Sequence, residues 1–263
     1  SLGEVLSSQI VSAYLIDQDF SVQWMDARKL IRTDHSFQEG KVDWKKTEQL
    51  VRENMLPSFI DADILLTQGF VGHTAEGFTT TLGREGSDYT AAIFAYCLNA
   101  ESVTIWKDVP GVLNADPKWF DETEKIEELS YHDAIELTYY GANVIHPKTI
   151  KPIQNKGITL YVKSFINPEE RGTAITNTKT PLPVASFIFK VNQVLISIFP
   201  KDFSFIIEEN LSQIFNILHK NKVKVNTMLN SAISFSVSVD NDEAKIKQLI
   251  SDLSETFKVK YNA

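Results

Sequence analysis

Residues 79–100 read TTTLGREGSDYTAAIFAYCLNA, and this stretch decides how the first part of the chain is expected to fold. Three threonines lead into a loop with two glycines and an arginine, and Ser87 and Asp88 stand where an apolar, helically spaced stretch begins. ADILLTQGFVG (62–72) precedes it as a predicted strand, and SVTIWKDV (102–109) follows as a second one. Strand, glycine loop, helix and strand predict a βαβ unit with a right-handed crossover.

The composition limits the classes of function. A chain of 263 residues suits one large or two ordinary domains. Its net charge of −8 argues against a surface for duplex nucleic acid, which needs clustered Lys and Arg, so no nucleic-acid partner is expected. The one cysteine, Cys97, excludes a disulfide framework. No apolar run approaches the roughly 20 residues that cross a bilayer, so we expect no membrane association and a cytoplasmic protein.

Two domains are predicted, residues 1–180 and 185–263. Alternating helices and strands in the first favour an α/β fold whose sheet is covered on both faces. Two prolines and several threonines at about 176–185 indicate a boundary. The pattern beyond it, from residue 194 onward, is the ferredoxin-like order βαββαβ. The predicted elements there are strands 186–191 and 194–199, helix 208–220, strands 223–228 and 231–239, helix 242–257 and strand 258–262.

The opening stretch has two interpretations. It is either an ordinary tight turn in which Ser87 or Asp88 caps the helix and Arg84 is solvated, or an anion site. The second gains from position, because a loop between a strand and a helix N-terminus presents backbone N–H groups and the helix dipole to an anion. Arg84 adds a planar fork for a carboxylate or phosphate. Asp88 could orient an amino group or a metal-bound water.

A second loop, WKDVPGVLNADP (106–117), follows the next predicted strand. It is either a proline-glycine turn or a second wall of the same site, with Lys107 and Asp108 facing the crevice that holds Arg84. The chain has no GxxxxGK[ST], which excludes a P-loop nucleotide site. It has no HExxH, paired cysteines or GxSxG, so zinc and serine-hydrolase chemistry have no support.

These segments resemble a known family. GFVGHTAEGFTTTLGREGSDYTAA (69–92), IWKDVPGVLNADP (105–117) and YGANVIHPKTI (140–150) are similar to the aspartokinases, in the amino-acid kinase superfamily. SLGEVLSS (1–8) resembles their G-E-x-x-S segment, and residues 195–240 resemble their first ACT regulatory module. The monofunctional, lysine-sensitive type is the most similar. The resemblance implies the C-terminal part of a carbamate-kinase-like αβα sandwich followed by a ferredoxin-like ACT module.

The resemblance also implies a reaction. Aspartokinases transfer the γ-phosphate of ATP to the β-carboxylate of L-aspartate, giving 4-phospho-L-aspartate on the route to lysine, threonine and methionine. By motif, Arg84 would grip the aspartate carboxylate and Glu4 its amino group, Phe70 and Ser87 would line the pocket, and Asp88 would organise the reacting groups. Mg²⁺ is expected to bridge the phosphates, with no residue predicted to bind a metal directly.

The ATP pocket departs from the family pattern at four positions. Lys107 stands in the T-D-V motif where a threonine is common, Leu113 where a tyrosine is common, Lys118 where an arginine is frequent, and Asn143 replaces a lysine. The predicted ATP-binding residues are Lys107, Asp108, Leu113, Lys118, Asn143 and Val144.

Regulation is implied through the ACT module, whose copies pair side by side across a homodimer. Val225, Asn226 and Ser231 match positions that contact lysine in the family, although Asn226 replaces an aspartate. Lysine is the expected effector and threonine the alternative. VNTMLNSAISFSV (225–237) is equally well interpreted as two strands of a hairpin.

The family's N-terminal K-F-G-G-T-S, whose lysine and glycines hold the transferring phosphate, does not occur in this sequence, and one ACT module is found where the family has two. The sequence therefore predicts a fragment cut at both ends and inactive by itself. Two alternatives stay open: a non-catalytic amino-acid-sensing ACT protein, and another amino-acid kinase such as glutamate kinase.

Overall fold

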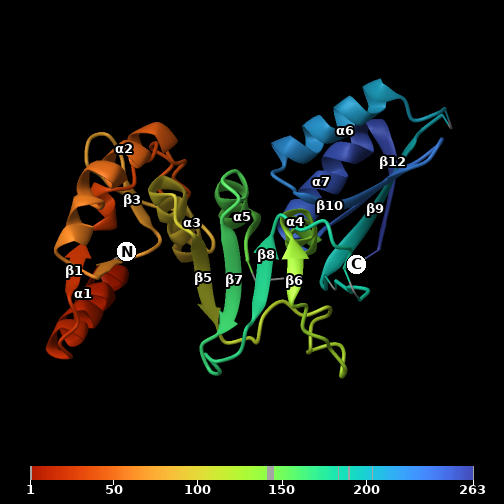
Figure 1. Cartoon of the computed structure of the whole chain (residues 1–263). Helices are drawn as coiled ribbons and strands as arrows, with labels where there is room; N and C mark the ends of the chain where they lie inside the picture. The colour runs from red at the N-terminus through yellow and green to blue at the C-terminus, as the bar shows by residue number, and fades with distance from the viewer. Residues whose placement is uncertain (1, 141–144, 183, 189, 203, 263) are drawn as a thin grey trace. The chain divides into compact units, whose positions relative to one another are not determined.

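The computed structural model describes residues 2–262, apart from 141–144, 183, 189 and 203, and divides into two compact units, Ser1–Ile188 and Phe189–Ala263 (Figure 1). The elements of the first unit are α1 (Leu2–Asp17), β1 (Val22–Met25), η1 (Ala27–Lys29), α2 (Trp44–Asn54), η2 (Pro57–Ile60), β2 (Ile64–Thr67), β3 (Val71–His73), β4 (Thr79–Thr81), α3 (Gly86–Leu98), β5 (Ser102–Lys107), β6 (Glu128–Ser130), α4 (Tyr131–Tyr140), α5 (Pro147–Gln154), β7 (Thr159–Ser164) and β8 (Thr173–Thr176). Those of the second are β9 (Gln193–Pro200), α6 (Glu208–Lys220), β10 (Val225–Asn230), β11 (Phe235–Asp240), α7 (Glu243–Thr256) and β12 (Phe257–Asn262).

The N-terminal part of the first unit is built on the parallel pair β1–β2. Helix α1 packs on this pair through small residues, because Ser8 and Ser12 are its buried positions and Trp24 Nε1 on β1 donates to Ser8 Oγ at 3.0 Å. Most large apolar side chains of α1, such as Leu6, Ile10 and Tyr14, are exposed. A separate core, which includes Ile31, Val51, Val71, Leu82, Ile93 and Cys97, lies between α2, α3 and β3.

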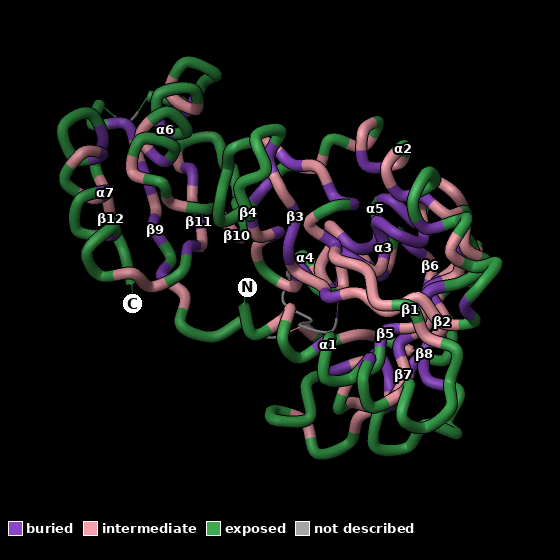
Figure 2. The backbone as a smooth tube through the Cα atoms, turned by 90° about the vertical axis from the view of Figure 1, so that its left-hand side faces the viewer, coloured by how far each residue is buried: buried purple, intermediate pink, exposed green. Residues whose placement is uncertain are grey.

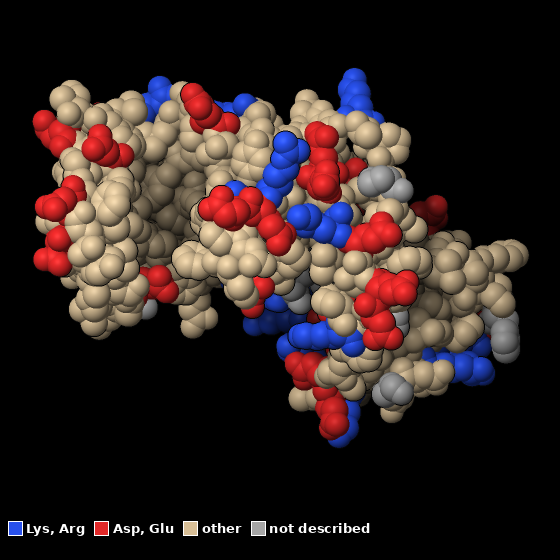
Figure 3. All heavy atoms as spheres, turned by 60° about the horizontal axis from the view of Figure 1, so that its bottom comes forward, with Lys and Arg blue, Asp and Glu red and all other residues tan. Residues whose placement is uncertain are grey.

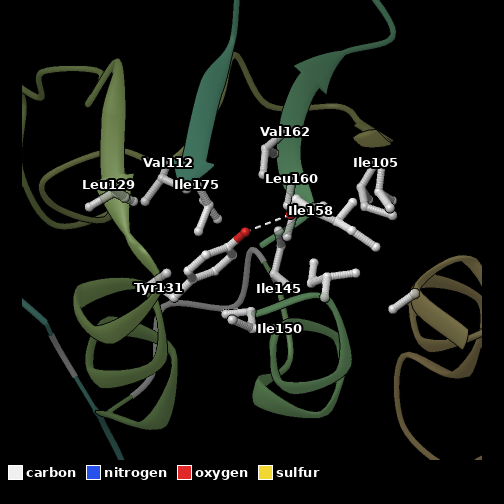
Figure 4. Packing of buried hydrophobic residues seen from close by; sticks show 14 of the residues in the cluster. Ile105, Val112, Leu129, Tyr131, Ile145, Ile150, Ile158, Leu160, Val162 and Ile175 are labelled. Carbon is white, nitrogen blue, oxygen red and sulfur yellow. Dashed lines mark hydrogen bonds between the residues drawn. The ribbon is translucent and has the colours of Figure 1, made fainter. Parts of the chain in front are cut away.

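The rest of the first unit is organised by a four-stranded sheet in the order β5-β7-β8-β6. β5 pairs with β7 and β6 with β8 in parallel, whereas β7 and β8 are antiparallel. Burial alternates along β7, so the buried side chains of the sheet, such as Leu160 and Val162, pack into one core with Ile150 and Ile153 of α5. Tyr131 at the start of α4 closes this core, and its hydroxyl donates to the carbonyl of Ile158 at 2.6 Å (Figure 4).

Two expectations about this sheet are corrected. The strands that flank α3, β2 and β5, lie in different sheets, because β2 takes β1 as its neighbour and β5 takes β7. The predicted βαβ crossover is thus not formed within one sheet of the described residues. The second corrected expectation is that the sheet is covered on both faces. The core covers one face, whereas on the other face Trp106 is 43% exposed and Thr104 and Tyr161 are half-buried.

The second unit has the predicted order βαββαβ, with an antiparallel sheet arranged β10-β11-β9-β12. Alternate apolar residues of the two central strands, such as Val194 and Ile196 on β9 and Val237 on β11, face a core shared with α6 and α7. The buried stretches, purple in Figure 2, follow these two strands. The hairpin strands begin later than predicted, at Val225 and Phe235.

The strand predicted at 186–191 is wrong. Its described residues have no strand pairing, and the N–H of Phe187 donates to the carbonyl of Asn114 at 2.7 Å. The Phe187 ring stacks on Phe120 with centroids 5.6 Å apart. An apolar sequence with strand propensity becomes a strand only where a partner edge is available, and here it meets a loop instead.

In the middle and on the right of the surface drawn in Figure 3, Lys and Arg lie among Asp and Glu, whereas its left-hand edge shows mainly Asp and Glu. Of the helices in the described part of the chain, none combines the length and the apolar character required to cross a bilayer.

Candidate active site

The loop after β2 is pressed against the N-terminus of α3. Phe70 has a positive φ of 72°, and its N–H donates to Thr90 Oγ1 on α3 at 3.0 Å. A Cβ atom at Gly86 would lie 2.6 Å from Phe70 Cδ2, and one at Gly69 would lie 2.9 Å from the Cα atom of Ser87. The two glycines therefore permit a contact that a larger residue would block, and they bring two predicted pocket residues, Phe70 and Ser87, together.

The start of α3 is a sharp turn built from two left-handed residues. Gly83 has φ 77°, and Glu85 has φ 52° and ψ 35°. The helix begins at Gly86, and its N-cap, Glu85, makes no side-chain capping hydrogen bond. The predicted capping role of Ser87 or Asp88 is therefore wrong, because both residues already lie inside the first turn. Arg84, between the two left-handed residues, is exposed.

Asp88 is instead held by a lysine from the neighbouring strand. Lys107, the last residue of β5, places its Nζ atom 2.7 Å from Asp88 Oδ2. The two side chains are 24% and 16% exposed, respectively, so the pair is mostly shielded from water. A charge-assisted hydrogen bond in such surroundings fixes both groups. The pair joins the carboxyl end of β5 to the N-terminus of α3.

Of the other predicted ATP-binding residues, Asp108, Leu113 and Lys118 lie along the loop after β5. Asp108 is exposed, and Leu113 is half-buried and forms an isolated antiparallel bridge with Lys125. Lys118 is exposed in a turn where its N–H donates to Asp116 Oδ1 at 2.9 Å. Thr173 Oγ1 holds the loop by accepting from the N–H of Val112 at 2.8 Å. The predicted residues Asn143 and Val144 lie outside the described residues.

Glu4 is distant from these loops in sequence. It stands in the first turn of α1 and is half-buried. Helix α1 contacts β1 and β2, and β2 leads into the loop of Phe70. The predicted role of Glu4 toward the aspartate amino group stays a prediction.

A cleft of about 540 Å³ was missed by the sequence analysis. It is lined by Ser36, Glu39, Gly40, Lys41, Val42, Trp44, Tyr89 and Lys148. Glu39 connects it to the arginine loop, because a Cβ atom at Gly83 would lie 2.9 Å from Glu39 Cγ. Lys148 Nζ forms an ion pair with Glu39 Oε1, and this hydrogen bond and the lysine charge lower the pKa of Glu39. Glu39 and Lys148 are far apart in sequence, and no periodicity linked them.

A second missed feature supports the ends of β1 and β2. Gln68 is 2% exposed, and its Nε2 donates to Asp26 Oδ1 at 2.5 Å. Arg28 pairs with the same carboxylate at 2.6 Å. Burial raises the pKa of Asp26, but the hydrogen bonds from Arg28 and Gln68 outweigh it and leave that pKa below its ordinary value. This network fixes the residue that precedes Gly69 and Phe70.

The predicted effector residues of the second unit lie at opposite ends of one strand. Val225 and Asn226 begin β10, whereas Ser231 follows its end. Ser231 closes the hairpin, since its N–H donates to the carbonyl of Ser234 at 2.8 Å and the two hydroxyl oxygens lie 2.8 Å apart. Within one chain, therefore, Ser231 is not close to the other two.

Metal binding by protein side chains alone finds no support in the described part of the chain, where no group of three or more His, Cys, Asp or Glu residues could hold an ion. Asp88 supplies the carboxylate in the first turn of α3, at the anion-favouring helix end. Mg²⁺ is commonly held by one or two carboxylates together with substrate phosphates, and this donor set fits that arrangement.

The candidate site lies at the carboxyl end of β5 and beside the N-terminus of α3, in an α/β unit. Comparison with known proteins identifies a family of enzymes with an α/β fold. Residues 1–164 match the amino acid kinase family, and the chain belongs to it. Among curated proteins it is similar to lysine-sensitive aspartokinase 3 of Escherichia coli, with 33% identity over 241 residues, which is 91% of this chain and 53% of the relative. The chain thus spans about half the length of that protein.

Solved structures of aspartokinases are also similar to this chain. The chain is similar to E. coli aspartokinase III in complex with lysine and aspartate, with a TM-score of 0.83, 32% identity and coverage of 99% of this chain and 59% of the other. It is similar to the same enzyme in complex with aspartate and ADP, with a TM-score of 0.83, 31% identity and coverage of 99% and 60%. Its particular likeness within the family is therefore to aspartokinases.

Proposed function

We propose that this chain is part of an aspartate kinase, which transfers the γ-phosphate of ATP to the β-carboxylate of L-aspartate and so forms 4-phospho-L-aspartate, the first step toward lysine, threonine and methionine. The observation that carries the proposal is the half-buried pair of Asp88 and Lys107 at the N-terminus of α3, beside the loop of Arg84 and Phe70. The relatives bind aspartate and ADP.

The proposed roles follow the charges at this helix end. Arg84 binds a carboxylate of aspartate through its planar fork, Glu4 binds the amino group, and Phe70 and Ser87 line the pocket. Asp88 organises the reacting groups. Phosphoryl transfer needs positioning and charge neutralisation more than covalent participation by the protein, and a fixed lysine–aspartate pair at a helix N-terminus supplies both.

ATP is proposed to lie along the loop that follows β5. Lys107 and Asp108 border the phosphates, Leu113 and Lys118 lie further along the same loop, and Asn143 with Val144 completes the predicted set. Mg²⁺, when bound, neutralises phosphate charge, with Asp88 as the carboxylate available to it. Because aspartokinase 3 of Escherichia coli is about twice as long as this chain, we expect full activity from the longer gene product and little from the 263 residues alone.

The second part of the chain, residues 185–263, is proposed as an ACT regulatory domain and residues 1–180 as part of the catalytic domain. The βαββαβ order of the second unit supports this assignment. A relative is bound to lysine, so lysine is the proposed effector and threonine the alternative. Val225, Asn226 and Ser231 are its proposed contacts. Because Ser231 lies at the other end of β10 from Asn226, a homodimer through paired ACT domains is proposed to supply the full site.

The test is hydroxylamine trapping of acyl phosphate from ATP, Mg²⁺ and L-aspartate. The full-length gene product is compared with the 263-residue chain, with and without lysine. Hydroxamate from the full-length protein, suppressed by lysine, is the expected result. L-glutamate replaces aspartate in a parallel reaction to detect a glutamate kinase. No hydroxamate with either substrate would overturn the enzymatic proposal and leave an amino-acid-sensing protein.

A further inference from the structure

A lysine ammonium already occupies the end of the second unit where Asn226 lies. Lys190 Nζ donates to Asn226 Oδ1 at 2.7 Å and lies 3.0 Å from Asp240 Oδ1. Lys190 precedes β9, Asn226 begins β10 and Asp240 ends β11. Three segments distant in sequence thus converge on one cation.

The oxygen atoms around this ammonium are held in place by a polar cluster, which we define as Gln193, Asn226, Ser238 and Asp240. Gln193 Nε2 donates to Asp240 Oδ1 at 2.8 Å. Asn226 Nδ2 donates to Gln193 Oε1 at 2.6 Å and to Asp240 Oδ1 at 2.9 Å, and Ser238 Oγ donates to Gln193 Oε1 at 3.1 Å. Because the side-chain N–H groups of Asn226 and Gln193 already donate hydrogen bonds within the cluster, the side-chain oxygen of Asn226 accepts a hydrogen bond from the ammonium.

The backbone at Asn226 favours this arrangement. The pairing of β10 with β11 shifts register between Val225 and Thr227, so Asn226 lies on a β-bulge. A bulge turns one side chain out of the regular alternation of its strand. Asn226 therefore aims at the pair formed by Gln193 and Asp240, which lie directly opposite each other on β9 and β11.

We propose that this polar cluster is a binding site for a primary ammonium group, and that Lys190 occupies it from within the chain in competition with a free alkylammonium ligand such as lysine. The site is open to such exchange, since the side chains of Lys190 and Asp240 are 38% and 60% exposed. Its regulatory meaning rests on the proposed function, whereas the ammonium site itself is argued from the contacts above.

The short segment that joins Lys190 to the anchored Asn192 determines how strongly the Lys190 ammonium competes with free lysine. Asn192, two residues further on, is anchored because Asn241 donates to it through its N–H at 3.0 Å and its side-chain amide at 3.2 Å. A group on so short a tether has an effective concentration in the millimolar range. Free lysine must exceed that concentration to displace it, and because the Lys190 pair is exposed and weak, removal of its ammonium is expected to strengthen binding of free lysine about twofold.

The experiment titrates L-lysine into the 263-residue chain and into Lys190→Met, following the side-chain amide signals of Asn226 and Gln193 by NMR. The variant is expected to shift these signals at lysine concentrations about twofold lower than the unsubstituted chain. n-Butylamine, which keeps the ammonium alone, is expected to bind the variant as well. Asn226→Ala added to Lys190→Met should abolish the response to both.

Lys245→Met is the matched control, because it removes another exposed lysine, paired with Asp242 at 2.8 Å, outside the cluster. It should leave lysine binding unchanged. Equal affinities for lysine in the unsubstituted chain and in Lys190→Met, or no shift in either, would overturn the proposal. The result is independent of the hydroxamate assay, because binding is read without catalysis.

Discussion

Each unit of the molecule carries a lysine–aspartate pair at the end of a strand, and the two pairs differ mainly in their exposure. Lys107 and Asp88 lie 2.7 Å apart with 24% and 16% of their side chains exposed. Lys190 and Asp240 lie 3.0 Å apart with 38% and 60% exposed. Their distances are similar, so water access distinguishes them.

The difference decides what each pair can do. In the first pair, breaking the contact would leave a charge in a partly shielded place, which is costly, so the two groups stay fixed. In the second, water and dissolved ions replace either partner at little cost. A fixed pair suits positioning of a reacting group, and an exposed one suits exchange with a ligand.

The largest expected effect is on kcat, which substitution of Asp88 should lower and substitution of Asp240 should not. Asp88→Asn in the full-length gene product should lower kcat about 10²–10³-fold, because the proposed organising charge is lost beside the transferring phosphate. Asp240→Asn should leave kcat without lysine within about twofold, as expected for a residue away from the chemistry. Hydroxamate formation at saturating ATP and aspartate measures both. A similar loss in the two variants would contradict the assignment.

Binding of aspartate gives a second contrast at the first site. Arg84→Ala should raise the KM for aspartate about 100-fold, since the proposed carboxylate contact is lost, and should leave the KM for ATP nearly unchanged. Arg84→Lys, which keeps the charge without the planar fork, should fall between. Steady-state kinetics with each substrate varied in turn measures the two constants. An equal rise in both would contradict the role given to Arg84.

Packing of the first site should be less tolerant than that of the exposed helix α1. Gly86→Ala places a methyl group where its Cβ atom would lie 2.6 Å from the Phe70 ring, and is expected to lower the free energy of unfolding by about 1–3 kcal/mol. Gly3→Ala, with nothing within 4 Å of its Cβ atom, is the control and should be neutral or slightly stabilising. Urea unfolding measures both. Equal stabilities would show that Phe70 moves aside.

The sequence predicted the second unit better than the first for a physical reason. Alternating apolar residues along β9 and β11, and a helical period in α6 and α7, are local signals, and a ferredoxin-like sheet follows from their order. The strand predicted at 186–191 failed because its pairing depends on a partner strand, which no local pattern reports. The same reason explains why β2 and β5 were wrongly placed in one sheet.

For the candidate site, the sequence identified the helix N-terminus and both loops, since glycines and a Ser-Asp pair are local signals. It failed on contacts between distant residues. Ser87 or Asp88 was predicted to cap the helix, but both lie inside its first turn because the helix begins at Gly86, after the left-handed Glu85. Glu39 with Lys148, and Lys190 with Asn226, join residues that no motif relates. Partners of charged side chains are fixed by tertiary packing, and the sequence contains no periodic record of them.

Stability should distinguish the two lysines directly. Lys107→Met leaves the Asp88 carboxylate unpaired in a mostly shielded position and is expected to lower the free energy of unfolding by about 1–3 kcal/mol. Lys190→Met removes a surface pair and should change it by less than about 0.5 kcal/mol. Urea unfolding of the 263-residue chain at neutral pH compares them. If Lys190→Met proved the more destabilising, exposure would not be what separates the pairs.

The smallest effect concerns the protonation of Asp240. Its pKa is lowered from 3.8 to about 2, first by the hydrogen bond from Gln193 and then, against the opposing effect of burial, by Lys190 and Asn226. A carboxyl whose pKa is lower in the folded state stabilises the fold above its ordinary pKa, and this contribution is lost as pH falls from about 4 through about 2.

Carbon NMR titration of the Asp240 carboxyl group measures this pKa in each variant. Gln193→Met should raise it because the amide hydrogen bond is the largest single cause, whereas Lys190→Met removes a smaller hydrogen bond together with a charge. Asp242, whose pKa is lowered mainly by Lys245, is an internal reference that neither variant should move. If the lysine substitution had the larger effect, the ammonium rather than the polar cluster would set the charge of this site. Lys190 would then be needed to form the site, and its removal would weaken lysine binding instead of strengthening it.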